Sequence, residues 1–276
     1  MLLDVQPDRA CYRPGETVQL LVSLTGWGTA EAGTEVQIVA SIAFLADEVT
    51  RLSSLVQLAG GPPATAKLAW TPPPAVPRGY GVDLHAVAPA TDLDGSGQVL
   101  AKASTAFDVL EHWTQAPRYG FLTDFWPERG GFEQTMRWLA RYHVNGLQFY
   151  DWMYRHDHLL PPGDVYDDPL GRRLSLATVR KLIDAAHARG VAAMPYTAVY
   201  GASPPFFQQH PDWALYDAEG EAIPFAKGFL MIMDPSPGSG WTEHLLGQFD
   251  EVLDRTEFDG IHLDQYGEPK VAHDAG

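Results

Sequence analysis

The spacing of apolar residues changes along this chain, and that change limits the possible folds more than any other feature of the sequence. Up to residue 112, apolar residues tend to recur at every second position, as in residues 16–26 (ETVQLLVSLTG), which is the pattern of a half-buried β-strand. Beyond that point, short apolar runs alternate with segments whose apolar residues recur every three or four positions, the pattern of an amphipathic helix. We therefore predict two domains of different class, residues 1–112 and residues 113–276.

The first domain is predicted to be an antiparallel β-sandwich. Period two returns in residues 34–45, 80–88 and 99–110, and clusters of proline and glycine separate these segments. Two tryptophans, Trp27 and Trp70, are candidates for contacts with a sugar or a partner protein, although packing explains them as well. Because this part shows no catalytic constellation, we expect it to brace the second domain, with a binding module as the alternative.

The second domain is predicted to consist of strand–helix units. Its expected strands are residues 119–123, 146–150, 191–197 and 258–263, and its expected helices are residues 131–143, 175–189 and 239–255. Such alternation is typical of parallel strands joined by right-handed crossovers. The absence of GxGxxG and GxxxxGKS sequences argues against a nucleotide-binding doubly wound sheet. We predict an α/β fold, the first half of a (β/α)8 TIM barrel. A whole barrel has eight strands, so we expect a truncated chain, with completion by dimerisation as the alternative.

Three aspartates, Asp124, Asp151 and Asp264, each follow directly on a predicted strand. In (β/α)8 barrels the catalytic groups project from the C-terminal ends of the strands, although Asp is also a common helix cap. Asp264 lies in the segment FDGIHLDQYG, where alternation places His262 on the same inward-facing side. We expect Asp259 to hold the start of that strand and Asp264 to be a catalytic nucleophile.

The loops that follow these strands are rich in aromatic residues. They are Phe125, Trp126, Trp152, Tyr154, Tyr196, Tyr200, Phe206, Phe207, Trp213 and Tyr216. Aromatic faces stack on pyranose rings, while carboxylates accept hydrogen bonds from sugar hydroxyls. The 35 acidic residues outnumber the 19 basic residues, for a net charge of −16, which argues against nucleic acid or an anionic membrane as a partner. This combination favours a neutral sugar substrate.

Other chemistries have weaker support in the sequence. His156-Asp157-His158 and the acidic segment 164–168 contain metal-ligand residue types, but no complete ligand set is recognisable, and we expect neither a metal nor a cofactor. No GxSxG nucleophile elbow occurs. The apolar runs are too short for a transmembrane helix, and the first ten residues, MLLDVQPDRA, do not resemble a signal peptide.

Several segments resemble the enzymes of glycoside hydrolase family 66. They are residues 118–126 (RYGFLTDFW), 142–156 (YHVNGLQFYDWMYRH), 191–201 (VAAMPYTAVYG), 233–236 (MDPS) and 258–267 (FDGIHLDQYG). The family comprises endo-dextranases and cycloisomaltooligosaccharide glucanotransferases. The segment CYRPGETV near the N-terminus also resembles the start of the family's immunoglobulin-like domain. The resemblance therefore implies an immunoglobulin-like sandwich followed by a catalytic barrel.

The resemblance also implies roles for particular residues. A retaining double displacement on α-1,6-linked glucan, either dextran or isomalto-oligosaccharides, is implied with Asp264 as the nucleophile. Substrate contacts are implied for Asp124, Asp151, Trp152, Tyr154, Tyr196, Tyr200, His262 and Gln265. The family's general acid/base is a glutamate on a later barrel strand, which this sequence does not contain, and Glu268 is a poor substitute. We therefore expect the chain alone to be inactive on glucan.

Two other functions stay open at this point. A cyclising glucanotransferase shares the same chemistry, and a decayed barrel that only binds glucan or another partner is a non-enzymatic alternative. The expected partner in each of the enzymatic cases is an α-glucan oligo- or polysaccharide. The family suggests secretion, whereas no export signal is visible, so the sequence leaves localisation and oligomeric state undecided.

Overall fold

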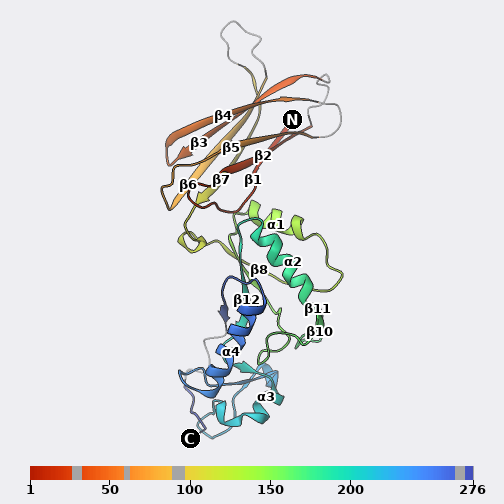
Figure 1. Ribbon diagram of the computed structural model, residues 1–276, viewed down its shortest axis with the longest axis vertical. Helices are drawn as coiled ribbons and strands as arrows, with labels where there is room; N and C mark the ends of the chain where they lie inside the picture. Colours follow the sequence, from red (N-terminus) through yellow and green to blue (C-terminus); the bar gives the residue numbers. More distant parts are fainter. Residues whose placement is uncertain (27–32, 59–62, 89–96, 265–270, 276) are drawn as a thin grey trace. The chain divides into compact units, whose positions relative to one another are not determined.

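The computed structural model describes most of the chain (Figure 1). The described residues are 1–26, 33–58, 63–88, 97–264 and 271–275. They form two compact units: the first comprises Met1–Arg118, Gln134–Asn145 and Ala188–Val191, and the second comprises Tyr119–Glu133, Gly146–His187 and Ala192–Gly276. The first unit thus includes two later segments that the sequence pattern did not assign to it.

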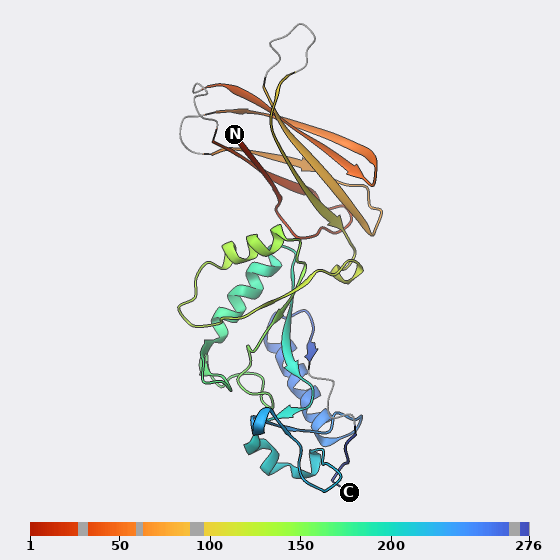
Figure 2. The same ribbon diagram turned by 180° about the vertical axis from the view of Figure 1, so that it is seen from behind.

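Seven strands make up most of the first unit, in two antiparallel sheets (Figures 1 and 2). One sheet has the order β1-β2-β5, with β1 at Leu2–Pro7, β2 at Val18–Thr25 and β5 at Ala64–Trp70. The other has the order β4-β3-β6-β7, with β3 at Glu35–Phe44, β4 at Asp47–Gln57, β6 at Arg78–Val87 and β7 at Val99–Val109. The predicted strands are therefore present.

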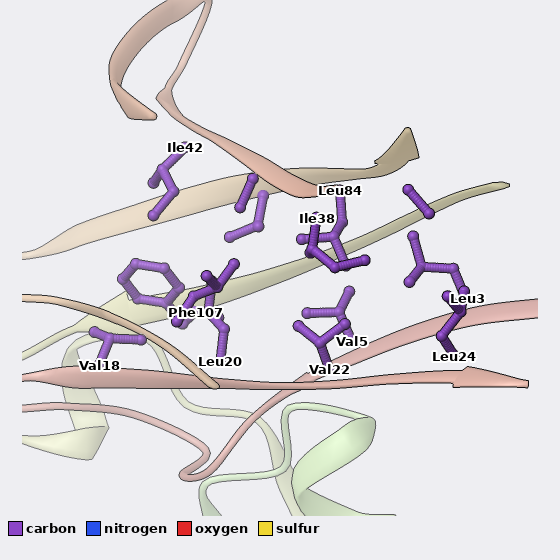
Figure 3. Close-up of a cluster of buried hydrophobic side chains, with 14 of the residues drawn as sticks. Leu3, Val5, Val18, Leu20, Val22, Leu24, Ile38, Ile42, Leu84 and Phe107 are labelled. Carbon is purple, nitrogen blue, oxygen red and sulfur yellow. The ribbon is translucent and has the colours of Figure 1, made fainter. Parts of the chain in front are cut away.

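Both sheets contribute to a single apolar core, shown in Figure 3. Leu20 and Val22 on β2 are at most 3% exposed, and Ile38 and Ile42 on β3 are fully buried. Period-two alternation makes this possible, because it turns every second side chain of a strand towards the other sheet. Burial of each such side chain stabilises the fold by about 1.5–3 kcal/mol. Trp70 also packs edge-on against Tyr80, at 5.2 Å between ring centroids, whereas Trp27 lies outside the described residues.

The two later segments are tied to this unit by polar contacts. The Gln6 side chain donates to the carbonyl of Arg137 at 2.9 Å, and Arg141 forms an ion pair with Asp4. The backbone amide of Ala10 donates to the carbonyl of Arg189 at 2.8 Å. These bonds link positions that are far apart in the sequence, which explains why local patterns did not predict them.

The second unit is built around a four-stranded parallel sheet. Its strands are β8 (Tyr119–Leu122), β9 (Gly146–Phe149), β12 (Ala192–Ala198) and β16 (His262–Asp264). Their spatial order is β8-β9-β12-β16, which is also their order along the chain. The sheet has the predicted strands in the predicted orientation. The last strand starts at His262, four residues later than expected, and Asp264 is its final residue.

Helices occupy the connections between these strands. α1 spans Phe132–Arg141, α2 spans Leu176–His187 and α4 spans Gly240–Arg255. The Ser175 hydroxyl accepts a hydrogen bond from the Thr178 amide at 3.2 Å, and the Ser239 hydroxyl accepts one from the Thr242 amide at 3.0 Å. Both serines satisfy backbone donors at a helix start, and the predicted cap at Ser175 is confirmed. No helix among the described residues is long and apolar enough to cross a membrane.

Shorter elements fill the long connections. β10 (Val165–Asp167) and β11 (Arg173–Ser175) form a hairpin, and β13 (Gly201–Ala202), β14 (Pro224–Phe225) and β15 (Leu230–Ile232) form a small sheet with β15 in the middle. The remaining short helices are η1 (Trp113–Gln115), α3 (Pro204–Gln209), η2 (Pro211–Trp213) and η3 (Ala226–Gly228).

Between β12 and α4, aromatic residues form a second apolar core. Trp241 and Met233 are fully buried there, and Phe206, Phe207, Trp213 and Tyr216 pack against them. Sequence analysis had placed these last four rings in sugar-binding loops, and the structure corrects that interpretation. These rings form a small apolar cluster under the long connection between β12 and α4, apart from the core of the first unit.

Candidate active site

Alternate residues of the parallel sheet bring polar and aromatic side chains onto one face. The Tyr196 ring on β12 lies 4.7 Å from the Tyr150 ring, which follows β9, and 6.3 Å from the His262 ring on β16. Tyr196 and His262 are register partners, and Ala198 is the partner of Asp264. His262 and Asp264 therefore share the face that carries Tyr196, as the alternation predicted.

This face is concave. The rings of Tyr119 on β8 and His262 on β16 stack at 5.5 Å, and the Tyr119 hydroxyl lies 3.1 Å from His262 Nδ1. These strands are the two outer strands of the sheet, so in a flat sheet they would be roughly 14 Å apart. Since side chains stand nearly perpendicular to a sheet, ring contact between its outer strands requires strong curvature.

Asp264 lies at the C-terminal end of β16 in a partly exposed position. Its carbonyl accepts a hydrogen bond from the Val199 amide at 3.0 Å, which fixes the backbone. Burial raises the pKa of Tyr196 far above its usual value, and the charge of the nearby Asp264 carboxylate raises it further. The Tyr196 hydroxyl thus stays protonated beside the carboxylate.

The imidazole of His262 is neutral near pH 7. Burial lowers its pKa below the ordinary value, although the Asp264 carboxylate opposes that effect. A neutral imidazole can both donate and accept hydrogen bonds. His262 can therefore orient hydroxyl groups without adding a positive charge next to Asp264.

Asp151 is held by an arginine from a different part of the sequence. Arg172 Nη2 lies 3.1 Å from Asp151 Oδ2 and 2.5 Å from Asp168 Oδ2. The Asp151 side chain is 17% exposed and that of Asp168 is fully buried. Burial raises the pKa of Asp151, and the Arg172 guanidinium opposes this rise.

A pocket of about 250 Å³ opens beside these residues within the second unit. Its lining residues are Tyr150, Asp151, Met153, His156, Asp168, Pro169, Leu170, Tyr196, Ala198, Phe225, Ala226, Phe229 and Leu230. The carboxylate of Asp151 raises the pKa of Tyr150, and burial and Asp264 add to this effect. Hydroxyls, carboxylates and apolar rings therefore converge on one concavity, an arrangement suited to a polyhydroxylated ligand with apolar faces.

Five of the predicted substrate contacts do not line this pocket, and one of them is His262, which lies on the same face of the sheet as Tyr196. Trp152 is fully buried, with its Nε1 donating to the Tyr196 carbonyl at 3.2 Å, so it offers no surface for a sugar and the prediction for it is wrong. Tyr154 carries Arg155 over its ring at 4.0 Å, and Tyr200 is 7% exposed. Asp124 is exposed, two residues beyond the end of β8 rather than one.

Part of the prediction lies outside the described residues. Gln265, an expected substrate contact, and Glu268, the weak acid/base substitute, both fall in the segment 265–270. Asp259, in contrast, holds the start of β16 as expected: its Oδ2 accepts a hydrogen bond from the Ala193 amide at 2.7 Å and lies 2.9 Å from His187 Nε2.

Two of the candidate metal ligands, Asp157 and Asp164, accept hydrogen bonds that hold the fold. Asp157 accepts hydrogen bonds from the amide and hydroxyl of Ser203, at 3.0 and 3.1 Å, and Asp164 accepts one from the Ala177 amide at 2.6 Å. His156 is 6% exposed. Within the described ranges, no three His, Cys, Asp or Glu side chains are grouped closely enough to hold a metal ion.

Sequence analysis missed three members of the site: Tyr150, Asp168 and Arg172. Tyr150 had a detectable signal, because it directly precedes Asp151 at the end of a predicted strand. Arg172 had none, because 21 residues separate it from Asp151 and the turn that brings it back has no sequence signature of its own.

Comparisons with known proteins agree with this geometry. A family model described as glycosyl hydrolase family 66 matches residues 7–276. A cycloisomaltooligosaccharide glucanotransferase of Niallia circulans is 29% identical over 284 residues, which cover 97% of this chain and 28% of that protein. A dextranase of Streptococcus salivarius is 24% identical over 201 residues, which cover 64% of this chain and 24% of that protein.

A solved structure is similar over nearly the whole chain. The crystal structure of a cycloisomaltooligosaccharide glucanotransferase of Paenibacillus sp., complexed with cycloisomaltoheptaose, superposes with a TM-score of 0.85 at 26% identity. The match covers 98% of this chain and 39% of that one. The present chain thus spans well under half the length of the proteins that it matches.

Proposed function

Since the chain belongs to glycosyl hydrolase family 66, we propose that it forms part of an enzyme that cleaves α-1,6-linked glucan, with Asp264 as the nucleophile of a retaining double displacement. One observation carries this proposal: the Asp264 carboxylate lies at the C-terminal end of a parallel strand, on the face that carries Tyr196 and His262. A carboxylate at the C-terminal end of a barrel strand is placed to attack the anomeric carbon of a bound sugar.

The pocket next to Asp264 supports a glucan as the substrate. Asp151 and Tyr150 offer polar atoms for sugar hydroxyls, and Phe225 and Phe229 line the same pocket. Glucosyl units present hydroxyls at their edges and C–H groups on their faces, so they match this mixture. We propose a (β/α)8 barrel as the complete catalytic domain, since the four parallel strands follow one another in order around a curved sheet.

We further propose that the general acid/base is a carboxyl group outside these 276 residues. A retaining mechanism needs a second carboxyl about 5–5.5 Å from the nucleophile. Asp151 is a poor candidate, because Arg172 occupies its carboxylate and opposes the rise of its pKa by burial. The chain by itself should then be inactive, or nearly so, on natural glucans, whose leaving groups require protonation.

A donor with a good leaving group tests Asp264 directly in this chain. α-Isomaltosyl fluoride needs no general acid: attack by Asp264 forms a bond from its carboxylate oxygen to the anomeric carbon, and the C–F bond breaks to release fluoride. Without an acid/base to activate water, the glycosyl-enzyme should accumulate. Intact-mass spectrometry should show one added isomaltosyl group, and peptide mapping should place it on Asp264.

The variants make the result specific. Asp264→Asn should form no adduct, whereas Asp250→Asn, a change at an exposed position on α4, should react like the unchanged chain. An adduct on another carboxylate would overturn the assignment of Asp264. Binding of isomaltotriose without any adduct, in a chain whose thermal unfolding is cooperative, would favour a non-catalytic glucan-binding protein.

A cyclising glucanotransferase is a second candidate function. The glucanotransferase of Niallia circulans aligns over 97% of this chain, whereas the dextranase of Streptococcus salivarius aligns over 64%. The two activities differ in the acceptor, which is either water or the distant end of the same glucan chain. Mass spectrometry of dextran digested with the product of the whole reading frame distinguishes them, because cyclic products weigh one water less than linear ones.

A further inference from the structure

The aspartate that follows β9 has an unusual backbone conformation. Asp151 has a φ of 52°, which lies in the left-handed region that non-glycine residues seldom occupy. Asp and Asn enter this region more readily than other residues, and such conformations persist only where neighbouring contacts hold them. The contacts that hold Asp151 are therefore part of what shapes the pocket.

Arg172 supplies such contacts to both the side chain and the backbone of Asp151. Its Nη2 lies 3.1 Å from Asp151 Oδ2 and 3.4 Å from the Asp151 carbonyl oxygen. One nitrogen thus bridges the two acceptors. Rotation of the carboxylate away from the pocket would break the shorter of these contacts.

Asp168 holds Arg172 in turn. Its Oδ2 accepts hydrogen bonds from Arg172 Nε at 2.7 Å and from Nη2 at 2.5 Å, while its Oδ1 accepts from the amides of Leu170 and Arg172, at 3.0 and 2.7 Å. These bonds close the turn between β10 and β11. Because the Asp168 side chain is fully buried, the guanidinium has little freedom to swing away.

The same turn forms part of the pocket wall. Asp168, Pro169 and Leu170 line the pocket together with Asp151. The charged groups that face Asp151 are Arg172 and Asp168. The charge of Asp151 also raises the pKa of the Tyr150 hydroxyl. The β10–β11 hairpin therefore carries both a wall of the pocket and the arginine that contacts its carboxylate.

We propose that Arg172, held by Asp168, is a positioning residue that fixes the Asp151 carboxylate as an acceptor for hydroxyl groups of a glucosyl unit in this pocket. The part of the proposal that concerns glucosyl units rests on the proposed function. The link between Arg172 and Asp151 is independent of it.

Two measurements on the 276-residue chain test the proposal. ¹³C NMR of the Asp151 carboxyl should show a higher pKa in Arg172→Gln than in the unchanged chain, because the guanidinium that opposes the effect of burial is gone. Calorimetric titration with isomaltotriose should show roughly tenfold weaker binding in Arg172→Gln, the loss expected for one misplaced charge-assisted hydrogen bond.

Two further variants separate positioning from folding. Arg172→Lys keeps the charge and should restore most of the Asp151 pKa, but not the full affinity, since ammonium lacks the fork geometry of guanidinium. Arg173→Gln changes the neighbouring exposed arginine and should alter neither quantity. Arg172→Lys also remains informative if Arg172→Gln fails to fold.

The outcomes distinguish this proposal from the proposed function. An unchanged Asp151 pKa in Arg172→Gln overturns the positioning role, whatever the sugar does. Full affinity for isomaltotriose in Arg172→Lys also overturns it, and that result can be obtained even if Arg172→Gln fails to fold. Equal weakening of isomaltotriose binding by Arg173→Gln also overturns it, because the effect would then be one of general charge. If the Asp151 pKa rises but the unchanged chain binds no isomaltotriose, the link between Arg172 and Asp151 is supported and the proposed function fails.

Discussion

The rings of Tyr119 and His262, which come from the two outer strands of the parallel sheet, stack with their centroids 5.5 Å apart. This contact joins positions 143 residues apart in the sequence and spans the concave face that carries Asp264. It couples the curvature of the sheet to the orientation of an imidazole beside the proposed nucleophile.

Removal of the Tyr119–His262 contact should lower stability in two steps. Tyr119→Phe keeps the stacking but loses the hydroxyl contact with Nδ1, at a cost of about 0.5–1.5 kcal/mol in the free energy of unfolding. Tyr119→Ala also loses the ring contact, which adds about 0.5–1.5 kcal/mol. Urea denaturation of Tyr119→Ala, His262→Ala and the double variant measures the coupling. A coupling near zero would show that the rings contact each other without stabilising the curved sheet.

Tyr196→Phe should slow the proposed chemistry while leaving the fold intact. It removes the hydroxyl whose pKa the Asp264 carboxylate raises but keeps the ring beside Tyr150 and His262. The rate of adduct formation with α-isomaltosyl fluoride should fall by about tenfold to a hundredfold, which corresponds to the loss of one hydrogen bond to a charged group. Tyr142→Phe, at a 73% exposed tyrosine, is the matched control and should keep the full rate. Equal rates for both variants would remove Tyr196 from the mechanism.

The buried imidazole of His156 should make stability fall in acid. Burial lowers its pKa to about 4, against the opposing effects of Asp157 and Asp168, whereas the unfolded imidazole takes up a proton near pH 6.5. Above pH 6.5 the imidazole is neutral in both states, and the fold keeps its full stability. As the pH falls towards 4, the unfolded imidazole takes up a proton while the buried one does not, which lowers the free energy of unfolding by about 3 kcal/mol.

His156→Phe removes the titrating group that causes this loss. The free energy of unfolding is measured with urea at pH 7 and at about pH 4.5. Its decrease between these two pH values should be about 2–3 kcal/mol smaller in His156→Phe than in the unchanged chain. His158→Phe, at an exposed histidine two residues away, should not change the pH dependence. A loss of equal size in His156→Phe would contradict the prediction.

Two glycines of α4 should respond to alanine in opposite directions. A Cβ at Gly240 would lie 2.2 Å from the Trp213 ring, whereas a Cβ at Gly247 would meet nothing within 4 Å. Gly240→Ala should therefore destabilise the fold by about 1–3 kcal/mol through overpacking, although alanine is the better helix former. Gly247→Ala should stabilise it by about 1 kcal/mol. Thermal unfolding of both variants is sufficient, and a stabilised Gly240→Ala would show that the Trp213 ring moves freely.

Much of the fold follows from local patterns. The period-two segments became the strands of the first unit, and the helix at Leu176–His187 begins after its predicted serine cap. His262 and Asp264 share one face because side chains alternate along a strand. These features depend on neighbours a few residues away, which is why the sequence alone predicts them.

The errors at the site have a backbone cause. Alternation would turn Trp152 towards the same face as Tyr150, but the left-handed conformation of Asp151 breaks the alternation, and Trp152 packs instead against Phe258, at 5.1 Å between ring centroids. A sequence pattern does not reveal a single residue with positive φ unless that residue is glycine. Arg172 escaped prediction for another reason, since its approach to Asp151 depends on the turn closed by Asp168.

The left-handed conformation shared by Asp124 and Asp151, with φ values of 71° and 52°, restricts which amino acids these two positions can hold. Both positions demand a tolerant backbone, and Asp151 also needs a negative charge for its proposed role. Asparagine tolerates the left-handed conformation but carries no charge, and glutamate carries the charge but tolerates the conformation less well. A β-branched residue such as valine offers neither. In a saturation library of the product of the whole reading frame, screened separately for folding and for glucan cleavage, aspartate should be the only residue at Asp151 that passes both screens, so other residues at this position should seldom persist in evolution.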